Sequence, residues 1–238
     1  MTNFIDGVIA KAKEARKTIV LPEGEDDRVL EAAFILTREK IAKIVLLGDE
    51  NEIRAKFAAN GWSLDDIELI NPKTSERLAK YADLFYELRK EKGVSREDAL
   101  KTAQSANYFG TLMIKAGDAD GMVSGAAHST ADTVRPALQI VKSARKDMDV
   151  SSFFFMSKDD KTFIFSDCGL TPCPDERGLA NIAIQSAQTA VKFGIEPEIA
   201  MLSYSTHGSG KGEAVDKVQK ATQLGKELAA SEEFKVLN

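Results

Sequence analysis

Apolar and polar positions follow two different periods along the first half of the chain. Short runs of consecutive apolar residues, typical of buried strands, alternate with longer segments of helical spacing. This alternation predicts a parallel sheet covered by helices on both faces, because strands buried on both sides read as continuous apolar runs. The expected strands are "TIVLPE" (18–23), "KIVLLGD" (43–49), "IELIN" (67–71) and "GMVSGA" (121–126).

The segments between these strands carry helix start and stop signals. Gly61 and Gly93 stand at the expected C-terminal caps, and Ser95 with Asp98 has the spacing of a capping box. An amphipathic helix is also expected to precede the first strand. The remaining expected helices cover 26–40, 51–61, 74–93, a segment opening at Ser95, 107–119, and about Thr133 to Lys146.

The pattern changes after Lys146. "SSFFFMSKDDKTFIFSDCG" (151–169) predicts a β-hairpin around a polar turn, with the aromatic residues Phe153, Phe154 and Phe155 in the core. Helices are expected over 175–194 and 212–230, with a strand over 198–206 between them. We therefore predict two α/β domains, 1–148 and 149–238. The second has few elements for a doubly covered sheet.

Composition and charge narrow the class of protein. The 238 residues carry a net charge of −5 with both signs interspersed, which disfavours nucleic acid as a partner. No secretory signal and no apolar run long enough to span a bilayer is evident, so a cytoplasmic protein without membrane association is expected. Two cysteines without neighbouring cysteine ligands predict neither a disulfide framework nor a zinc site, and no metal is expected.

Two loops that follow expected strands are candidates for chemistry. "SGAAHSTADTVRP" (124–136) and "SYSTHGSGKGE" (203–213) contain both histidines of the chain, His128 and His207. Ligands of open parallel sheets bind beyond the carboxyl ends of the strands. Because both loops consist of small and hydroxyl-bearing residues ahead of a helix, their backbone N–H groups are expected to face an anion.

The first loop permits two interpretations. Ser124, His128 and Asp132 resemble the parts of a hydrolytic triad, but the nucleophile motif G-x-S-x-G is absent and all three lie in one short segment. The other interpretation is an anion clamp. With Thr133 near the helix cap, Arg135 falls in the first turn, where its charge opposes the helix dipole unless an anion lies beside it. Residues 129–133 also suit simple helix capping.

Several other candidates remain open from spacing alone. "GSGKGE" fails both the P-loop and the dinucleotide pattern, so this loop is either solvated or in contact with a phosphate-bearing cofactor. A dehydrogenase function would rest on fold analogy alone. Arg89 near a helix C-terminus suits a structural role in the helix dipole. Cys168, between a strand and a turn, is typical of a small buried residue.

Five segments together resemble bacterial phosphate acetyltransferase (phosphotransacetylase) along essentially the whole chain. They are "LPEGEDDRVLEAA", "YELRKEKG", "ANYFGTLMIKAGDADGMVSGAAHSTADTVRPALQI", "FSDCGLTPCPD" and "MLSYSTHGSGKGEAVDKV". The resemblance implies reversible acetyl transfer between coenzyme A and inorganic phosphate, without a metal, a tightly bound cofactor or an acetyl-enzyme. It also implies two α/β domains like those of isocitrate and isopropylmalate dehydrogenases, an active site between the domains, and a homodimer.

The resemblance assigns residues as well. Arg135 and Arg89 match arginines of the family's phosphate and CoA site, and Cys168 matches a cysteine near that site that is not the nucleophile. For Arg89 this replaces the structural role expected from spacing. The two loops would line the cleft as substrate-binding segments, through Ser124, His128, Ser129 and Thr130 and through Ser205 and Thr206.

The chain departs from the family pattern in one respect. Members of the family continue for about another hundred residues, typical of a second complete domain. That segment supplies a serine–arginine pair and an aspartate to which the general-base role is assigned, so the second domain is expected to be incomplete and this chain alone impaired. It is also expected to expose apolar surface. The alternatives are a phosphate butyryltransferase and a non-catalytic domain that binds CoA or phosphate.

Overall fold

A computed structural model describes residues 3–143, 150–159, 161–206 and 208–231. The chain divides into two compact units. One comprises Asp6–Lys142, and the other comprises Met1–Ile5 together with Ser143–Asn238. Helix α1 (Asn3–Ala15) therefore begins in the smaller unit, which contains Ser143–Asn238, and continues into the larger unit, Asp6–Lys142. The predicted domain boundary near residue 148 lies outside the described residues.

The larger unit contains a four-stranded parallel sheet in the order β3-β2-β1-β4. Its central strands form as predicted, because their consecutive β-branched and leucine side chains are buried on both faces. The chain passes from β1 through β2 to β3 and then crosses to the opposite side of β1. The strands are β1 (Thr18–Leu21), β2 (Lys43–Leu47), β3 (Ile67–Ile70) and β4 (Gly121–Met122).

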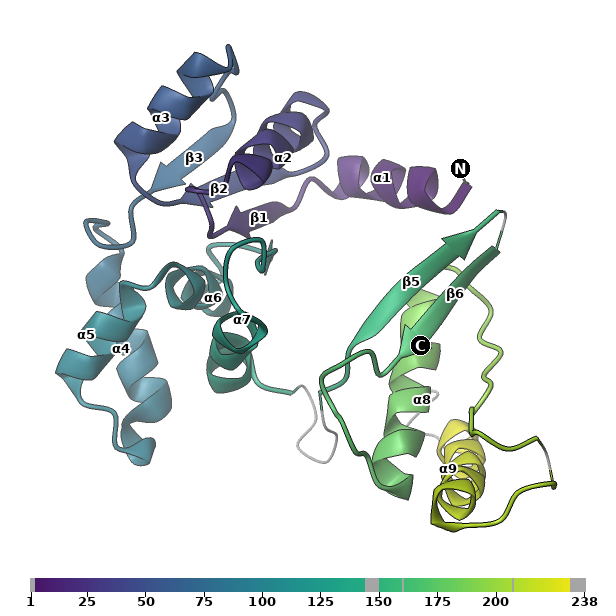
Figure 1. The fold of residues 1–238 in the computed structure, drawn as a ribbon. Helices are drawn as coiled ribbons and strands as arrows, with labels where there is room; N and C mark the ends of the chain where they lie inside the picture. Colours follow the sequence, from purple (N-terminus) through teal and green to yellow (C-terminus); the bar gives the residue numbers. More distant parts are fainter. Residues whose placement is uncertain (1–2, 144–149, 160, 207, 232–238) are drawn as a thin grey trace. The chain divides into compact units, whose positions relative to one another are not determined.

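Helices cover both faces of this sheet (Figure 1). Val20, Val45 and Leu47 point to one face, and Leu21, Ile44 and Leu46 to the other, as the period of two along a strand requires. The helices α2 (Asp27–Arg38) and α3 (Glu50–Ala59) cover the second face. The first is covered by α4 (Leu78–Arg89), α5 (Arg96–Ala103) and α6 (Ala106–Ala116).

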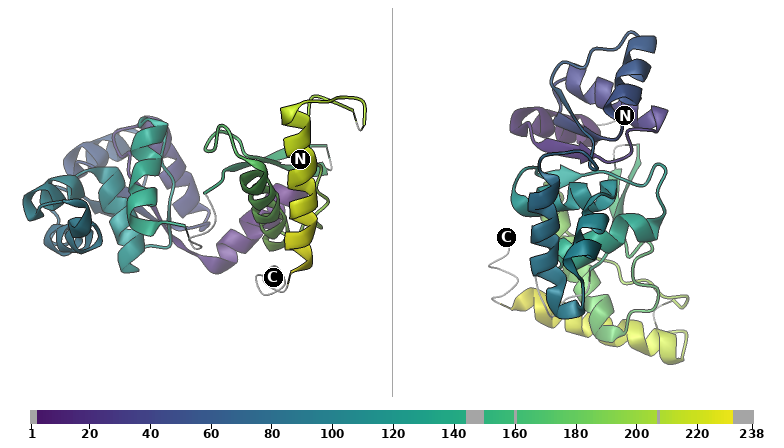
Figure 2. Two further views of the ribbon diagram at one scale, coloured as in Figure 1. Left: turned by 90° about the horizontal axis from the view of Figure 1, so that it is seen from below. Right: turned by 90° about the vertical axis from the view of Figure 1, so that its left-hand side faces the viewer.

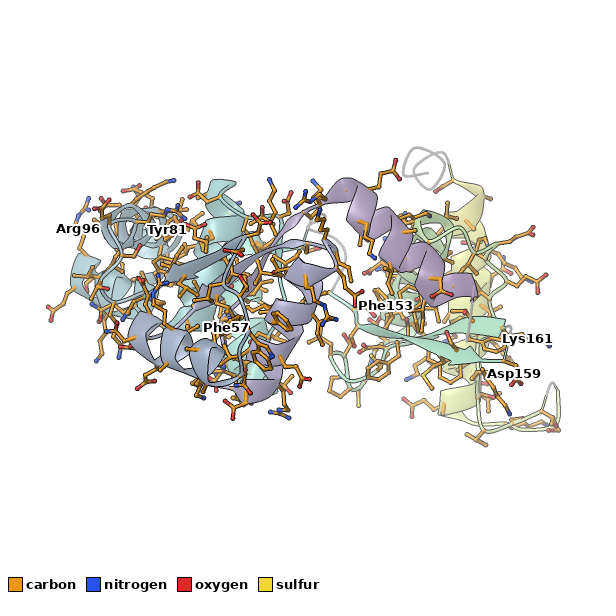
Figure 3. All side chains as sticks on the ribbon, turned by 90° about the horizontal axis from the view of Figure 1, so that it is seen from above. Phe57, Tyr81, Arg96, Phe153, Asp159 and Lys161 are labelled. Atoms are coloured by element: carbon orange, nitrogen blue, oxygen red, sulfur yellow. The ribbon has the colours of Figure 1, made fainter. Side chains whose placement is uncertain are left out.

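One large aromatic residue is central to each of these two cores. Phe57 of α3 and Tyr81 of α4 are both fully buried, on opposite faces of the sheet (Figure 3). Phe57 packs edge-on against Trp62, and Tyr81 packs edge-on against Phe109. This confirms the predicted sheet with two covered faces, and with it the α/β class.

The helix termini follow their local signals. Gly61 and Gly93 adopt φ of 66° and 82°, which a glycine accepts without steric cost. The Ser95–Asp98 capping box is present, with both of its hydrogen bonds. The helix predicted for 74–93 is shorter, since a 3₁₀ turn at Lys90–Lys92 follows α4.

Two predictions near residue 130 are wrong. The strand predicted over 121–126 ends at Met122, because the chain turns into a loop bound to other groups from residue 125. The next helix, α7 (Thr130–Pro136), begins three residues before Thr133, because the Ser129 hydroxyl accepts from the N–H of Asp132 as N-cap. A π-helical segment, Ala137–Val141, follows. Arg135 therefore lies in the last turn of α7, and the first-turn dipole argument for it fails.

The smaller unit is built from a hairpin and two helices. As predicted, β5 (Phe153–Lys158) and β6 (Lys161–Ser166) are antiparallel, and Asp159 and Lys161 lie at the tip of the hairpin (Figure 3). The predicted helices form as α8 (Glu176–Lys192) and α9 (Glu213–Ala230), which lie side by side (Figure 2).

Two other expectations for this unit are wrong. The described residues of 198–206 form no strand, because no other described strand pairs with them, and Leu202 remains 83% exposed. Of the three phenylalanines expected in the core, only Phe155 packs inward, against Phe4 and Phe193. Phe153, on the same face as Phe155, packs edge-on against it but stays 41% exposed. Phe154 points to the opposite face of the hairpin, which no second layer of described residues covers, and is therefore exposed.

Candidate active site

The strand order places the first candidate loop at the switch point of the sheet. Successive strands run from β1 to β3 in one direction and then continue on the other side of β1 with β4. Val20 pairs with Met122, so the chain segments that leave β1 and β4 emerge next to each other. Ligands of open parallel sheets bind at such a point. The loop 124–129 is therefore where this fold predicts a site.

A buried carboxylate holds this loop. Glu23, which follows β1, is 1% exposed, and its two oxygens accept hydrogen bonds from four consecutive backbone N–H groups. Gly125 and Ala126 donate to Oε2 at 3.0 and 2.9 Å, and Ala127 and His128 donate to Oε1 at 2.8 Å each. The Nδ1 atom of His128 lies 2.8 Å from the same Oε1.

These contacts keep Glu23 ionised despite its burial. Burial by itself raises the pKa of a carboxyl group, since it disfavours the charged form. Here the N–H groups of Ala127, Ala126 and His128 and the His128 ring outweigh burial and lower the pKa of Glu23 to about 2. Glu23 is therefore an anion at neutral pH. The expectation that the N–H groups of this loop face an external anion is wrong for residues 125–128, since the chain's own carboxylate occupies them.

A second tie fixes the same loop to the start of α2. The Arg28 guanidinium donates through Nη2 to the carbonyl oxygen of Ala126 at 2.7 Å and to the carboxylate of Asp26 at 2.6 Å. The side chain of Asp26 also accepts from the backbone N–H of Arg28 as the N-cap of α2. The loop is therefore held by two residues of the segment between β1 and α2 and the first turn of α2, namely Glu23 and Arg28.

Asn107 of α6 connects the loop with α7. Pro136 has no N–H, so the carbonyl oxygen of Asp132 loses its helical partner. The buried Asn107 side chain replaces that partner, with Nδ2 donating to the Asp132 carbonyl at 3.2 Å. Its Oδ1 accepts from the Ser124 hydroxyl at 2.8 Å. One amide thus satisfies the carbonyl group exposed by the proline and fixes the first residue of the loop.

The contacts around these residues disfavour the hydrolytic triad. The Ser124 hydroxyl donates to Asn107, and the His128 ring faces Glu23. The Asp132 carboxylate accepts from the Ser129 hydroxyl at 2.7 Å. None of the three pairs with another of the three in the described structure, so this segment consists of loop and capping contacts. Thr130 is exposed as the first residue of α7.

Arg89 and Arg135 both lie close enough to Tyr108 for their charges to act on its hydroxyl. Burial raises the pKa of the Tyr108 hydroxyl, and the positive charges of Arg135 and Arg89 offset this increase only in part. Arg135 is exposed and Arg89 is half-buried at the end of α4. The Nε atom of Arg89 is buried without a hydrogen-bond partner among the described residues. A buried donor of this kind is costly unless a ligand or water binds it. The structure thus places two cations near Tyr108, and one of them has a buried donor without a partner among the described residues.

The other predicted site residues belong to the smaller unit. Cys168 is half-buried, and its backbone N–H donates to the Ser152 hydroxyl at 3.3 Å. The adjacent Asp167 accepts from Ser152 and from the backbone N–H groups of Leu170 and Thr171, so this loop too is organised around a carboxylate. Burial acts to raise the pKa of Asp167, but these donors lower it to about 2.

Ser205 and Thr206 form a small hydroxyl cluster with Ser209. The Thr206 and Ser209 hydroxyls lie 2.6 Å apart, and the Ser205 hydroxyl donates to the Thr206 carbonyl at 2.8 Å. His207, the second histidine of this loop, lies outside the described residues. The loop is thus closed by its own hydrogen bonds.

Metal-ligand clusters and membrane-spanning helices are absent from the described residues. In the part of the chain that the structure describes, no group of three or more His, Cys, Asp or Glu side chains is placed to hold a metal ion. No helix within the described ranges combines the length and apolar character needed to cross a bilayer.

Sequence reasoning does not identify Glu23 or Asn107. Glu23 lies in the acidic run "EGEDD", which looks like the solvated start of a helix. The available signal is positional, since Glu23 lies two residues after the end of β1, just as Ser124 lies two residues after the end of β4. Using that signal requires knowing that β1 and β4 are neighbours.

The fold and the switch-point loop place the chain among α/β proteins whose chemistry lies beyond the carboxyl ends of parallel strands. The family model described as "Phosphate acetyl/butaryl transferase" matches residues 3–234. A phosphate acetyltransferase of Thermoanaerobacterium thermosaccharolyticum is 49% identical over 233 residues, covering 95% of this chain and 70% of that protein. One of Nitratidesulfovibrio vulgaris is 45% identical, covering 95% of this chain and 32% of that protein.

A solved structure gives the same result. The EutD phosphotransacetylase from Staphylococcus aureus superposes with a TM-score of 0.88 at 45% identity, covering 98% of this chain and 70% of that one. The chain belongs to the phosphate acetyl/butaryl transferase family. Because these relatives are named as acetyltransferases, the butyryltransferase alternative is not favoured.

Proposed function

We propose that this protein is a phosphate acetyltransferase, which converts acetyl-CoA and inorganic phosphate reversibly into acetyl phosphate and CoA. The observation that carries the assignment to a site is the pair Arg89 and Arg135 beside Tyr108, with the Nε of Arg89 buried and without a partner among the described residues. Both reactants of this reaction are anionic, and a guanidinium group matches the geometry of phosphate oxygens.

The chemistry we propose is a direct displacement. In the direction of thioester synthesis, the CoA thiolate sulfur attacks the acetyl carbon of acetyl phosphate. The bond between that carbon and the bridging oxygen breaks, and phosphate leaves with the electron pair. Catalysis then depends on orienting two anions and on stabilising charge at the leaving phosphate. Arg135 and Arg89 suit the second task. The proposed substrate-binding residues of the larger unit are Ser124, His128, Ser129 and Thr130. Those of the smaller unit are Cys168, Ser205 and Thr206.

The reaction also needs a base that removes the proton of the CoA thiol. The resemblance assigns the general base to a segment for which this sequence has no counterpart, and the chain spans 70% of the length of the first relative. We therefore expect the 238-residue polypeptide alone to turn over slowly. The proposed location is the cytoplasm and the proposed assembly a homodimer. CoA and acetyl-CoA act as substrates, with no tightly bound cofactor.

The test is thioester formation from acetyl phosphate and CoA. The 238-residue polypeptide is compared with the same polypeptide extended by the part of the Thermoanaerobacterium relative that it does not match. We expect CoA binding by both and rapid acetyl-CoA formation by the extended form alone, with acetyl phosphate used in preference to butyryl phosphate. A folded extended protein that binds CoA but forms no thioester contradicts the proposal. Fast turnover by the 238 residues contradicts only the assignment of the base.

A further inference from the structure

We propose that Glu23 is a positioning residue of this site, which fixes the shape of the loop 125–128 and the tautomer of His128. The geometry is a carboxylate, enclosed by four consecutive backbone N–H groups and one imidazole nitrogen, at the switch point between β1 and β4. The inference rests on the proposed function for the identity of the ligand, but not for the geometry.

The position of Glu23 is itself rigid. Gly24, the next residue, donates its N–H to the carbonyl oxygen of Leu47 at 3.0 Å, which ties this segment to the end of β2. On the other side, Val123 donates its N–H to the carbonyl oxygen of Val20. The carboxylate and the loop thus extend from adjacent strands of one sheet. Through its hydrogen bonds, Glu23 fixes the loop 125–128, whose side chains are small, to the rigid sheet.

The tautomer follows from the charge of Glu23. An ionised carboxylate can only accept hydrogen bonds, so the Nδ1 atom of His128, 2.8 Å from Oε1, carries a proton. The other ring nitrogen, Nε2, has no hydrogen-bond partner among the described residues, and the side chain is 29% exposed. In the neutral ring Nε2 is therefore an acceptor that a ligand can reach. A monohydrogen phosphate, which carries one P–OH donor, is the probe that suits it.

Glu23→Gln is the variant that tests this role. A carboxamide has the same shape as a carboxylate, but it places an NH₂ group where one oxygen accepts two N–H bonds. We expect the loop to lose at least that pair of bonds and His128 to lose its preference for a proton on Nδ1. Glu23→Asp keeps the charge and is the conservative rescue. Glu25→Gln, at an exposed acid two residues away, is the matched control.

The readouts are the ring ¹⁵N chemical shifts of His128 and the affinity for inorganic phosphate by calorimetry. The sequence has two histidines, so a His207→Gln variant assigns the spectrum. We expect the Nδ1–H tautomer in the wild type, in Glu23→Asp and in Glu25→Gln, and its loss in Glu23→Gln. Phosphate affinity should fall about tenfold or more in Glu23→Gln, the effect of one lost hydrogen bond to a charged group.

Glu23→Gln could fail to fold, so a second variant, His128→Asn, tests the same role independently. In His128→Asn the side-chain NH₂ occupies the place of Nδ1–H and still donates to Glu23, while the acceptor Nε2 is removed. It should fold like the wild type and bind phosphate about tenfold more weakly.

An Nε2–H tautomer in the wild-type protein overturns the inference. Unchanged His128 shifts and phosphate affinity in a folded Glu23→Gln variant also overturn it. If the tautomer depends on Glu23 as expected but the wild type binds no phosphate, the positioning geometry stands and the proposed function fails instead.

Discussion

Single residues decide how the loops of this protein are placed, and Gly24 is the clearest case. A Cβ atom added to Gly24 would lie 2.6 Å from the carbonyl oxygen of Leu47 and 2.7 Å from Cδ1 of Ile53. Real Cβ atoms do not approach backbone oxygen this closely, so the segment after β1 must move if residue 24 has a side chain. Because Glu23 is its neighbour, the same movement would displace the carboxylate from the loop 125–128.

Gly24→Ala should therefore lower the free energy of unfolding by about 1–3 kcal/mol, the usual cost of overpacking a well-packed core. Gly7→Ala is a control of opposite sign. Gly7 lies in α1, where an added Cβ would have no other atom within 4 Å, and alanine there should stabilise the helix by about 0.5–1 kcal/mol. Urea unfolding curves of both variants measure the difference. Equal stability of Gly24→Ala and the wild type would contradict the close approach.

At the scale of elements, the sequence predicts the regular parts of the larger unit and misses its connections. The strands β1 to β3 and their helices follow from apolar runs and capping signals that act locally. Helix α7 begins at Thr130 instead of the expected Thr133, and the sequence leaves this open because Ser129, Thr130 and Thr133 all suit a cap. The choice of Ser129 depends on where Glu23 and Asn107 hold the preceding loop.

The difference between local signals and tertiary contacts also decides which residues of the site can be predicted from the sequence. Arg135, His128 and Ser124 can be named because they lie in an unusual loop after an expected strand. Glu23 and Asn107 act only through strand order and helix packing, which periodicity does not reveal. The strand expected over 198–206 does not form for a related reason, since an apolar run forms a strand only where another strand pairs with it.

Asn107 gives the test at this scale. Asn107→Ala removes the donor that satisfies the Asp132 carbonyl and the acceptor of the Ser124 hydroxyl. The variant should lose about 1–3 kcal/mol of stability, the cost of unpaired buried polar groups. Amide hydrogen exchange in α7 should also become faster. The matched control is Asn60→Ala, which breaks an exposed side-chain bond to the Lys56 carbonyl and should cost less than about 0.5 kcal/mol. Similar losses in both variants would contradict the bridging role.

At the scale of the whole molecule, the smaller unit exposes an apolar face. Phe154, Met156, Phe163 and Phe165 point to the same side of the hairpin, as their pairing requires, and are 44–57% exposed. Contiguous apolar side chains of this kind are unusual on a monomer's surface and favour association. The opposite face is covered in part, since Phe155 packs against Phe4 and Phe193.

The 238-residue polypeptide should therefore bind an apolar dye and associate as its concentration rises. The double substitution Phe154→Thr with Phe165→Thr should weaken both effects. Leu100→Thr, at an exposed leucine on α5, should not. Sedimentation velocity over a range of concentrations, with dye fluorescence in parallel, measures the change. A polypeptide that stays monomeric and binds no dye would contradict the exposed face.

In the proposed acetyl transfer, Arg89 and Arg135 bind the phosphate group. The most direct test is the initial rate of thioester formation from acetyl phosphate and CoA, measured in the extended polypeptide for the wild type, Arg135→Gln, Arg89→Gln and Arg96→Gln. Arg96 is the control, because it pairs with Asp83 and stacks on Tyr86 at the surface. We predict a loss of about 100-fold or more for Arg135→Gln and Arg89→Gln, as for removal of a preorganised charge-stabilising donor, and wild-type rates for Arg96→Gln. Wild-type rates in folded Arg135→Gln and Arg89→Gln would contradict phosphate binding by these two arginines.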